Sequence, residues 1–109
     1  MQKIEEYPYC FHTLSNGIRL VHRYTPSIVS HCGLTIGIGS RDEKLSENGT
    51  AHFVEHCLFK GTSKRKAYRI LDCIDGVGGE LNAFTTKEET CVYGLYLQQY
   101  HERFLELLA

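Results

Sequence analysis

The sequence predicts one domain that combines β-strands with α-helices. An Asn-Gly pair separates two strand-like runs near the start of the chain, and apolar residues recur at helical spacing in its middle and at its end. A chain of 109 residues is long enough to bury a core. Its formal net charge of -1 predicts no nucleic-acid partner, and the lack of a long apolar run predicts no membrane span.

Strands are expected in the first third of the chain. Residues 9–14 and 18–24 flank the Ser-Asn-Gly sequence at 15–17, and Asn-Gly between two such runs favours a tight hairpin. A further strand is expected from His31 to Ile38, where apolar residues alternate with small ones. The small residues are Gly33, Gly37 and Gly39. They predict that other backbone packs closely against this strand.

Two helices are expected in the middle of the chain. The first runs from Ala51 to Phe59, and Gly61 is expected to stop it. The second runs from about residue 66 to residue 75 and has one apolar stripe at the spacing of a buried helix face. The candidates to cap the start of the first helix are Ser46, Asn48 and Thr50.

Two strands and a third helix are expected at the end of the chain. Residues 80–85 and 90–97 are typical of strands joined by a hairpin loop at 86–89. Residues 99–109 are expected to be helical, and the apolar stripe of this helix consists of Tyr100, Phe104, Leu107 and Leu108. Because no cap or polar tail follows, we expect this stripe to lack cover and the chain to be the front part of a longer protein.

The first helix contains the pattern H-x-x-E-H, from His52 to His56. Residues four apart lie one above the other on a helix, so His52 and His56 can direct two imidazoles at one ion. Glu55 falls at the edge of the same face. Two neutral imidazoles and a nearby carboxylate are typical of a hydrolytic zinc site, where the metal acidifies a bound water and the carboxylate takes its proton.

The other side chains of this helix, from residue 51 to residue 59, are apolar. A helix that is apolar nearly all round is expected to be buried. Buried His and Glu side chains need partners, and one metal ion would satisfy all three. The alternative is a chance pattern of two core histidines and one surface glutamate.

The remaining reactive residue types are expected to have ordinary roles. Five widely spaced cysteines without a C-x-x-C pair favour reduced core thiols in a cytoplasmic protein over a disulfide framework. The basic run at residues 64–66 is expected to be a solvated loop. No apolar stretch follows Met1 to Glu6, so no ordinary signal peptide is expected. The histidines without a partner at ligand spacing are expected to be ordinary surface or edge residues: His12, His22 and His31.

Three stretches together resemble one family, that of pitrilysin, insulysin and the mitochondrial processing peptidase. Residues 52–62 resemble the signature of the family, and residues 14–19 are similar to its opening hairpin. Residues 78–85 resemble the block that follows the signature, which Glu88, Thr90 and Tyr93 continue at the family's spacing. These stretches cover nearly the whole chain.

The resemblance implies a fold and an activity. The fold would be an α+β domain in which a mixed, largely antiparallel sheet carries helices on one face. The activity would be that of a zinc metallopeptidase that hydrolyses peptide bonds in peptides or unfolded segments. His52 and His56 would be metal ligands, Glu55 the general base and Glu88 a supporting acidic residue.

The resemblance also implies how the parent protein would be built. The strand through Asn82, Ala83 and Phe84 would lie beside the metal, and a peptide would add to it as an extra strand. The third ligand would be a Glu about seventy-five residues past the second His, beyond residue 109. A second homologous domain or subunit would help to close the chamber. Residues 1–109 would be the N-terminal portion of a single peptidase domain, inactive on their own.

Two other functions stay open on the residues alone. S-ribosylhomocysteine lyases are similar at H-x-x-E-H, but a Cys is the third ligand of their zinc or iron. A non-catalytic partner subunit of a peptidase would keep the fold for assembly, although such subunits usually have a degraded motif and this motif is intact. Residues 59–62 and 82–85 favour the peptidase over the lyase.

Overall fold

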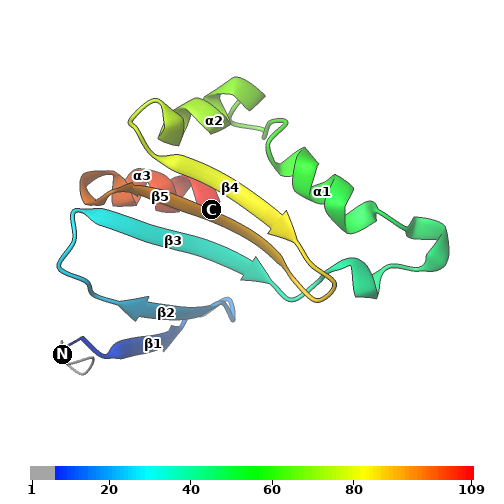
Figure 1. Cartoon of the computed structure of the whole chain (residues 1–109), viewed down its shortest axis with the longest axis horizontal. Helices are drawn as coiled ribbons and strands as arrows, with labels where there is room; N and C mark the ends of the chain where they lie inside the picture. Colours follow the sequence, from blue (N-terminus) through cyan, green and yellow to red (C-terminus); the bar gives the residue numbers. More distant parts are fainter. Residues whose placement is uncertain (1–6) are drawn as a thin grey trace.

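The computed structural model describes residues 7–109. Met1 to Glu6, the segment from which no signal peptide is expected, lies outside the described residues. The strands are β1 (Tyr9–Thr13), β2 (Arg19–Arg23), β3 (Val29–Ile36), β4 (Glu80–Thr85) and β5 (Thr90–Leu97) (Figure 1). The helices are α1 (Thr50–Leu58), α2 (Ala67–Asp75) and α3 (His101–Leu108). The short 3-10 turns are η2 (Ser40–Asp42), η3 (Leu45–Glu47) and η4 (Gln98–Tyr100).

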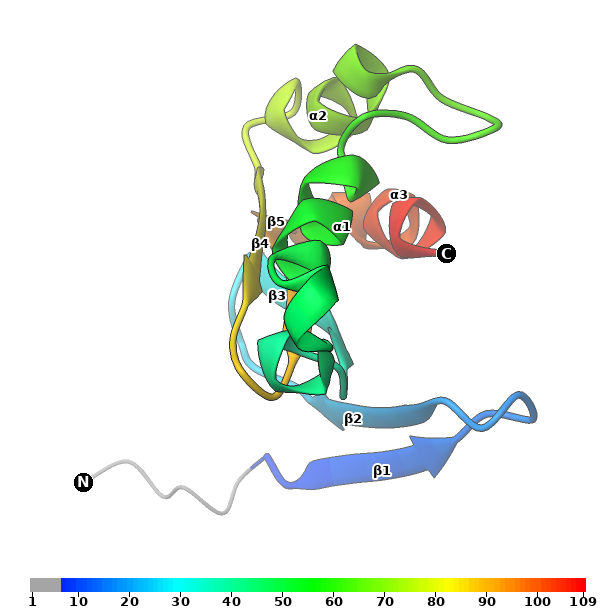
Figure 2. The ribbon, with the colours of Figure 1, turned by 90° about the vertical axis from the view of Figure 1, so that its right-hand side faces the viewer.

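The main sheet has the strand order β3-β5-β4, so β5 is central and β3 and β4 are its edges. The helices lie on one side of this sheet (Figure 2). Helix α3 packs on β5 and β3, α2 packs against α3 and β4, and α1 runs along β4. The predicted α+β class with helices on one face is therefore confirmed, and every strand pairing within residues 7–109 is antiparallel.

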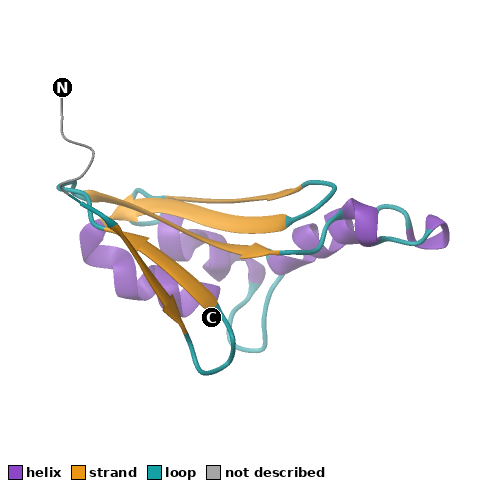
Figure 3. Ribbon diagram, turned by 90° about the horizontal axis from the view of Figure 1, so that it is seen from below, coloured by secondary structure: helices purple, strands orange, loops and turns teal. Residues whose placement is uncertain are grey.

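Strands β1 and β2 pair with each other and form a separate two-stranded sheet (Figure 3). The turn between them is the predicted one, because Gly17 has a φ of +90°, where glycine is favoured, and its N–H donates to the Leu14 carbonyl at 2.9 Å. Every residue of this hairpin is exposed. The histidines expected to be at the surface are indeed exposed: His12, His22 and His31.

The core lies between the main sheet and the helices α2 and α3. Its fully buried side chains are Ile74, Tyr96 and Phe104, each at most 2% exposed. A Cβ at Gly94 would overlap the Phe104 ring, so only glycine at this position of β5 lets α3 pack so closely. The expectation that the stripe of α3 lacks cover is wrong, because the sheet and α2 cover Phe104 completely. The partly buried members of this stripe are Tyr100, Leu107 and Leu108.

The segment after β3 is held against the loop between β4 and β5. The Ser40 N–H donates to the Thr86 carbonyl at 3.0 Å, and the Arg41 N–H donates to the Lys87 carbonyl at 2.8 Å. A Cβ at Gly39 would overlap the Thr86 carbonyl oxygen. The close backbone approach predicted from the glycines is thus confirmed at Gly39, whereas Gly37 has open space around it.

The cysteines are all unpaired within the described residues. Cys91 is buried, and the half-buried ones are Cys32 and Cys73. The expectation that most are buried is wrong, because Cys10 lies on the exposed hairpin and Cys57 on an open side of α1. No α-helix among residues 7–109 combines the length and the apolarity that crossing a membrane requires.

Candidate metal centre

Helix α1 begins at Thr50 because two features prepare its first turn. Gly49 precedes the helix with a φ of +90°, which favours glycine. The Glu43 carboxylate accepts hydrogen bonds from the Gly49 N–H at 2.8 Å and from the Ala51 N–H at 2.7 Å. The predicted caps are therefore wrong, since the capping oxygens come from upstream, and the Thr50 hydroxyl donates to the Glu47 carbonyl instead. The residues that do not cap α1 are Ser46, Asn48 and Thr50.

Helix α1 ends close to where the sequence predicts. Its last residue is Leu58, and Phe59 follows as the C-terminal cap. Gly61 has a φ of +132°, a conformation that other residues rarely adopt. The chain therefore turns away from the helix axis at Gly61, as the predicted stop requires.

His52 and His56 direct their rings at one place. Their Nε2 atoms are 2.8 Å apart, and their ring centroids are 4.6 Å apart. Two nitrogens that each lie about 2.0–2.1 Å from one tetrahedral Zn²⁺ are roughly 3.3 Å apart. The two Nε2 atoms would therefore occupy two ligand positions of one zinc ion if the rings moved slightly apart. This geometry confirms that the two rings point at one place, as their spacing predicts, and their role as metal ligands stays a prediction.

Glu55 is the half-buried member of the motif. Its Oε2 accepts a hydrogen bond from the Thr85 hydroxyl, at the end of β4. Thr85 is not among the site residues predicted from the sequence. The signal that could have found it is the alternation along β4, which puts Thr85 on the same face as Leu81 and Ala83. The bond ties the carboxylate of α1 to the sheet.

Helix α1 is less buried than its sequence predicts. Phe53 is 68% exposed, Val54 50% and Leu58 42%, and no residue of the helix is fully buried. The physical reason is position: α1 lies along an edge strand, which covers one side of the helix and leaves the rest open. The prediction of burial nearly all round is thus wrong for this part of the chain.

The histidine pair has no third ligand beside it in the described chain. Within residues 7–109, no group of three His, Cys, Asp or Glu side chains is arranged to hold a metal ion. Catalytic zinc sites have three protein ligands and an open fourth position. His52 and His56 would supply two of the three. The position of the third ligand beyond residue 109 stays a prediction.

Asn82, Ala83 and Phe84 lie on β4, the strand next to α1. Ala83 is half-buried on the face that carries the helices, whereas Asn82 and Phe84 are exposed on the opposite face. There the Phe84 ring lies 5.9 Å from the Tyr93 ring. One edge of β4 pairs with β5, and its other edge pairs with no strand of residues 7–109. A peptide in extended conformation can add to such an edge.

Glu88 lies in the loop between β4 and β5 and pairs with Arg41. Its Oε1 is 2.6 Å from Arg41 Nη1, and both side chains are about two-thirds exposed, at 69% and 67%. The pair links this loop to η2, beside the backbone hydrogen bonds that hold the same two segments together. The structure thus brings Glu88 to Arg41, a partner that the sequence did not indicate.

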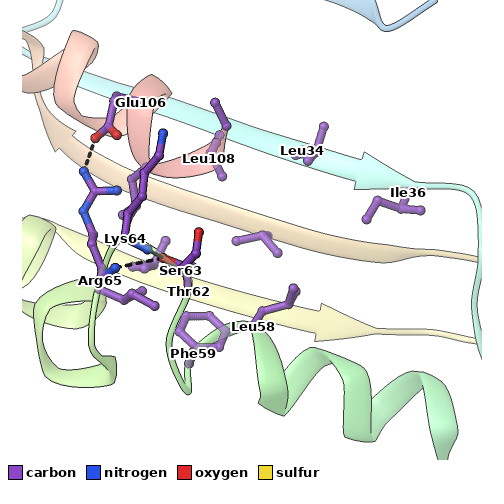
Figure 4. Close-up of a pocket in the computed structure, with 15 residues that line it drawn as sticks. Leu34, Ile36, Leu58, Phe59, Thr62, Ser63, Lys64, Arg65, Glu106 and Leu108 are labelled. Carbon is purple, nitrogen blue, oxygen red and sulfur yellow. Dashed lines mark hydrogen bonds and ion pairs between the residues drawn. The ribbon is translucent and has the colours of Figure 1, made fainter.

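An apolar groove of about 520 Å³ opens on the helix side of the sheet, between the end of α1 and α3 (Figure 4). Leu34, Leu58 and Leu108 are among its lining residues and come from β3, α1 and α3. Arg65 and Glu106 form an ion pair beside the groove, which joins the loop after α1 to α3. The basic run expected to be solvated is therefore paired at Arg65, whose pKa is raised by its hydrogen bond to Glu106.

Comparison with known proteins gives relatives over nearly the whole chain. Residues 19–109 match the insulinase family (peptidase family M16). An uncharacterized zinc protease of Mycobacterium leprae is 48% identical over 101 residues, which make up 92% of this chain and 23% of that protein. The beta subunit of the mitochondrial-processing peptidase of Saccharomyces cerevisiae is 38% identical over 97 residues, or 88% of this chain and 21% of that protein.

A solved structure has the same fold as this chain. The crystal structure of a protease from Helicobacter pylori matches with a TM-score of 0.89 and 28% sequence identity. The match covers 93% of this chain and 25% of the other. The chain therefore spans about a quarter or less of the length of the relatives that it matches.

Proposed function

We propose that the parent protein of this chain is a zinc metalloendopeptidase, because the chain belongs to the insulinase family of peptidases. The observation that carries the proposal is the pair of His52 and His56, with Nε2 atoms 2.8 Å apart on the helix that also carries Glu55. The zinc protease among the relatives supports the same activity. The family match favours this activity over that of the lyase that the motif alone left open.

The proposed roles follow from the chemistry of each side chain. His52 and His56 would hold the zinc ion as neutral imidazoles, with a third ligand expected beyond residue 109. When bound, zinc supplies a Lewis acid that polarises the peptide carbonyl and acidifies water. The Glu55 carboxylate would take a proton from the attacking water and return it to the leaving amine. Its hydrogen bond with Thr85 keeps this carboxylate beside the sheet.

We propose a peptide or an unfolded segment as the substrate. The edge of β4 that has no strand partner in the described residues would pair with the backbone of such a segment, through Asn82, Ala83 and Phe84. Backbone pairing accepts many sequences, because every residue except proline offers the same N–H and C=O groups. Glu88 would act as a supporting acidic residue, through its ion pair with Arg41.

A second homologous domain or subunit is the proposed protein partner. The yeast relative is itself named as the beta subunit of a processing peptidase, which supports a partner of this kind. For the cellular location, we propose the cytoplasm. The support is the set of five scattered cysteines, all unpaired within the described residues.

The test is the cleavage of a fluorogenic peptide by the full-length protein. Removal of metal with a chelator should abolish cleavage, and added Zn²⁺ should restore it. His56→Ala should lose both zinc and cleavage, because one imidazole of the pair is gone. The matched control is His31→Ala, at an exposed histidine of β3, which should retain both. Cleavage that persists without zinc, or an equal loss in the two variants, would contradict the proposal.

A further inference from the structure

The carboxylate that acts as a general base must keep one orientation. A glutamate side chain has several rotatable bonds, so an unanchored Glu55 would spend much of its time turned away from the substrate. In the structure, Glu55 Oε2 accepts a hydrogen bond from Thr85 Oγ1. An ionised carboxylate accepts at both of its oxygens, so this bond leaves Oε1 available for the reacting proton.

Thr85 comes from a different element than Glu55. It is the last residue of β4 and lies on the face of the sheet that carries the helices. Its neighbour across the ladder is Thr90, the first residue of β5. The hydrogen bond between Thr85 and Glu55 thus links the sheet to α1, which packs along the same strand.

The position of Thr85 is itself fixed by the segment that follows β3. Directly after Thr85, the Thr86 and Lys87 carbonyls accept hydrogen bonds from the N–H groups of Ser40 and Arg41, at 3.0 Å and 2.8 Å. Gly39 packs so tightly there that a side chain would overlap the Thr86 carbonyl. Residues 39–41 and 86–87 thus form a clamp. It holds the loop after β4 against the segment after β3.

We propose that Thr85 is a positioning residue for Glu55. The clamp holds Thr85 in the place from which its hydroxyl reaches the Glu55 carboxylate. The inference rests on the proposed role of Glu55 as general base. Thr85 touches Glu55 through its hydroxyl and acts on the reaction through Glu55. The methyl group of the threonine has no part in this role, so serine should replace Thr85 and valine should not.

The experiment compares Thr85→Val with Thr85→Ser in the full-length protein. Valine keeps the shape and removes the hydroxyl, so kcat should fall roughly ten- to a hundredfold, as expected for loss of a hydrogen bond to a charged group. The KM and the zinc content should stay near their wild-type values, because His52 and His56 are unchanged. Serine should restore kcat to within a few fold of wild type. Thr85→Ala is the second hydroxyl-free variant and carries the test if the valine variant does not fold.

The matched control is Thr35→Val. Thr35 lies exposed on β3 of the same sheet, and its hydroxyl donates to Cys91 Sγ at 3.6 Å, away from Glu55 and the clamp. Its loss should leave kcat unchanged. A wild-type kcat in the hydroxyl-free variants at Thr85, a serine variant as slow as the valine variant, or an equal loss in Thr35→Val would overturn the inference.

Glu55→Gln, measured in the same assay, separates the two proposals. If Glu55→Gln is inactive and Thr85→Val is fully active, the positioning role fails and the proposed function stands. If Glu55→Gln keeps its turnover, the role of Glu55 fails, and the positioning role fails with it.

Discussion

His52 and His56 point their rings at the same place because about one helical turn separates them. This relation can be read from sequence, since the i, i+4 spacing is a local property of a helix. The partner of Glu55 could not be read in the same way, because Thr85 lies 30 positions further on. Pairings of this kind depend on which strand lies beside which helix, and that is decided by the packing of the whole chain.

Tyr96 leads to a prediction about alkaline pH. Burial raises the pKa of its hydroxyl above the ordinary value, and burial likewise raises the pKa of the Cys32 thiol nearby. The folded chain therefore keeps these protons at pH values where the unfolded chain has released them. The ionisation of Tyr96 therefore leaves the free energy of unfolding unchanged at neutral pH and should lower it as the pH rises through about 10 and above.

Denaturant titrations of the purified chain between about pH 8 and about pH 11 measure this effect. Tyr96→Phe removes the titrating group and should flatten the alkaline fall in stability. Tyr24→Phe, at a tyrosine that is 54% exposed, is the control and should leave the fall unchanged. The same alkaline fall in wild type and Tyr96→Phe would show that Tyr96 is not its cause.

Among the elements, β4 and β5 have the bounds that the sequence predicts, at 80–85 and 90–97. Alternation at period two and a polar loop of four residues define such a hairpin locally. The burial of α1 was predicted wrongly, because the apolar pattern shows that a helix can be buried but not how much partner surface is available. The N-terminal cap was also missed, since Glu43 reaches the helix from outside any local capping pattern.

The Glu43 cap leads to a prediction about α1. Glu43→Ala leaves the N–H groups of Gly49 and Ala51 without this partner and should destabilise the chain by about 0.5–2 kcal/mol. Glu47→Ala is the control, because the bond that Glu47 makes to Thr50 uses its backbone carbonyl. Denaturation followed by circular dichroism measures both variants. Equal stability of Glu43→Ala and wild type would mean that the carboxylate does not support the helix.

At the scale of the whole molecule, the three helices share one side of the sheet, with α1 at its open edge (Figure 2). The resemblance to the peptidase family predicted the layer of helices. It did not predict that the first hairpin forms its own sheet. An Asn-Gly turn between two strands specifies how these strands pair with each other, but not whether they join another sheet.

The incomplete ligand set leads to a prediction about the chain alone. With two histidines and no third ligand among the described residues, the purified 109-residue chain should bind zinc weakly and cleave no peptide. Metal analysis after dialysis, with a peptidase assay beside it, measures both properties. Stoichiometric zinc together with turnover would show that residues 1–109 hold a complete site.

The metal centre is tested most directly by zinc content and peptide turnover of the full-length Glu55→Gln variant. Glutamine keeps the size of the side chain and removes its basic carboxylate, while His52 and His56 stay in place. We predict that zinc stays at the wild-type level and that turnover falls roughly a hundredfold to ten-thousandfold or more. Turnover near that of wild type would remove Glu55 from the mechanism, and loss of zinc would make Glu55 a ligand instead of the base.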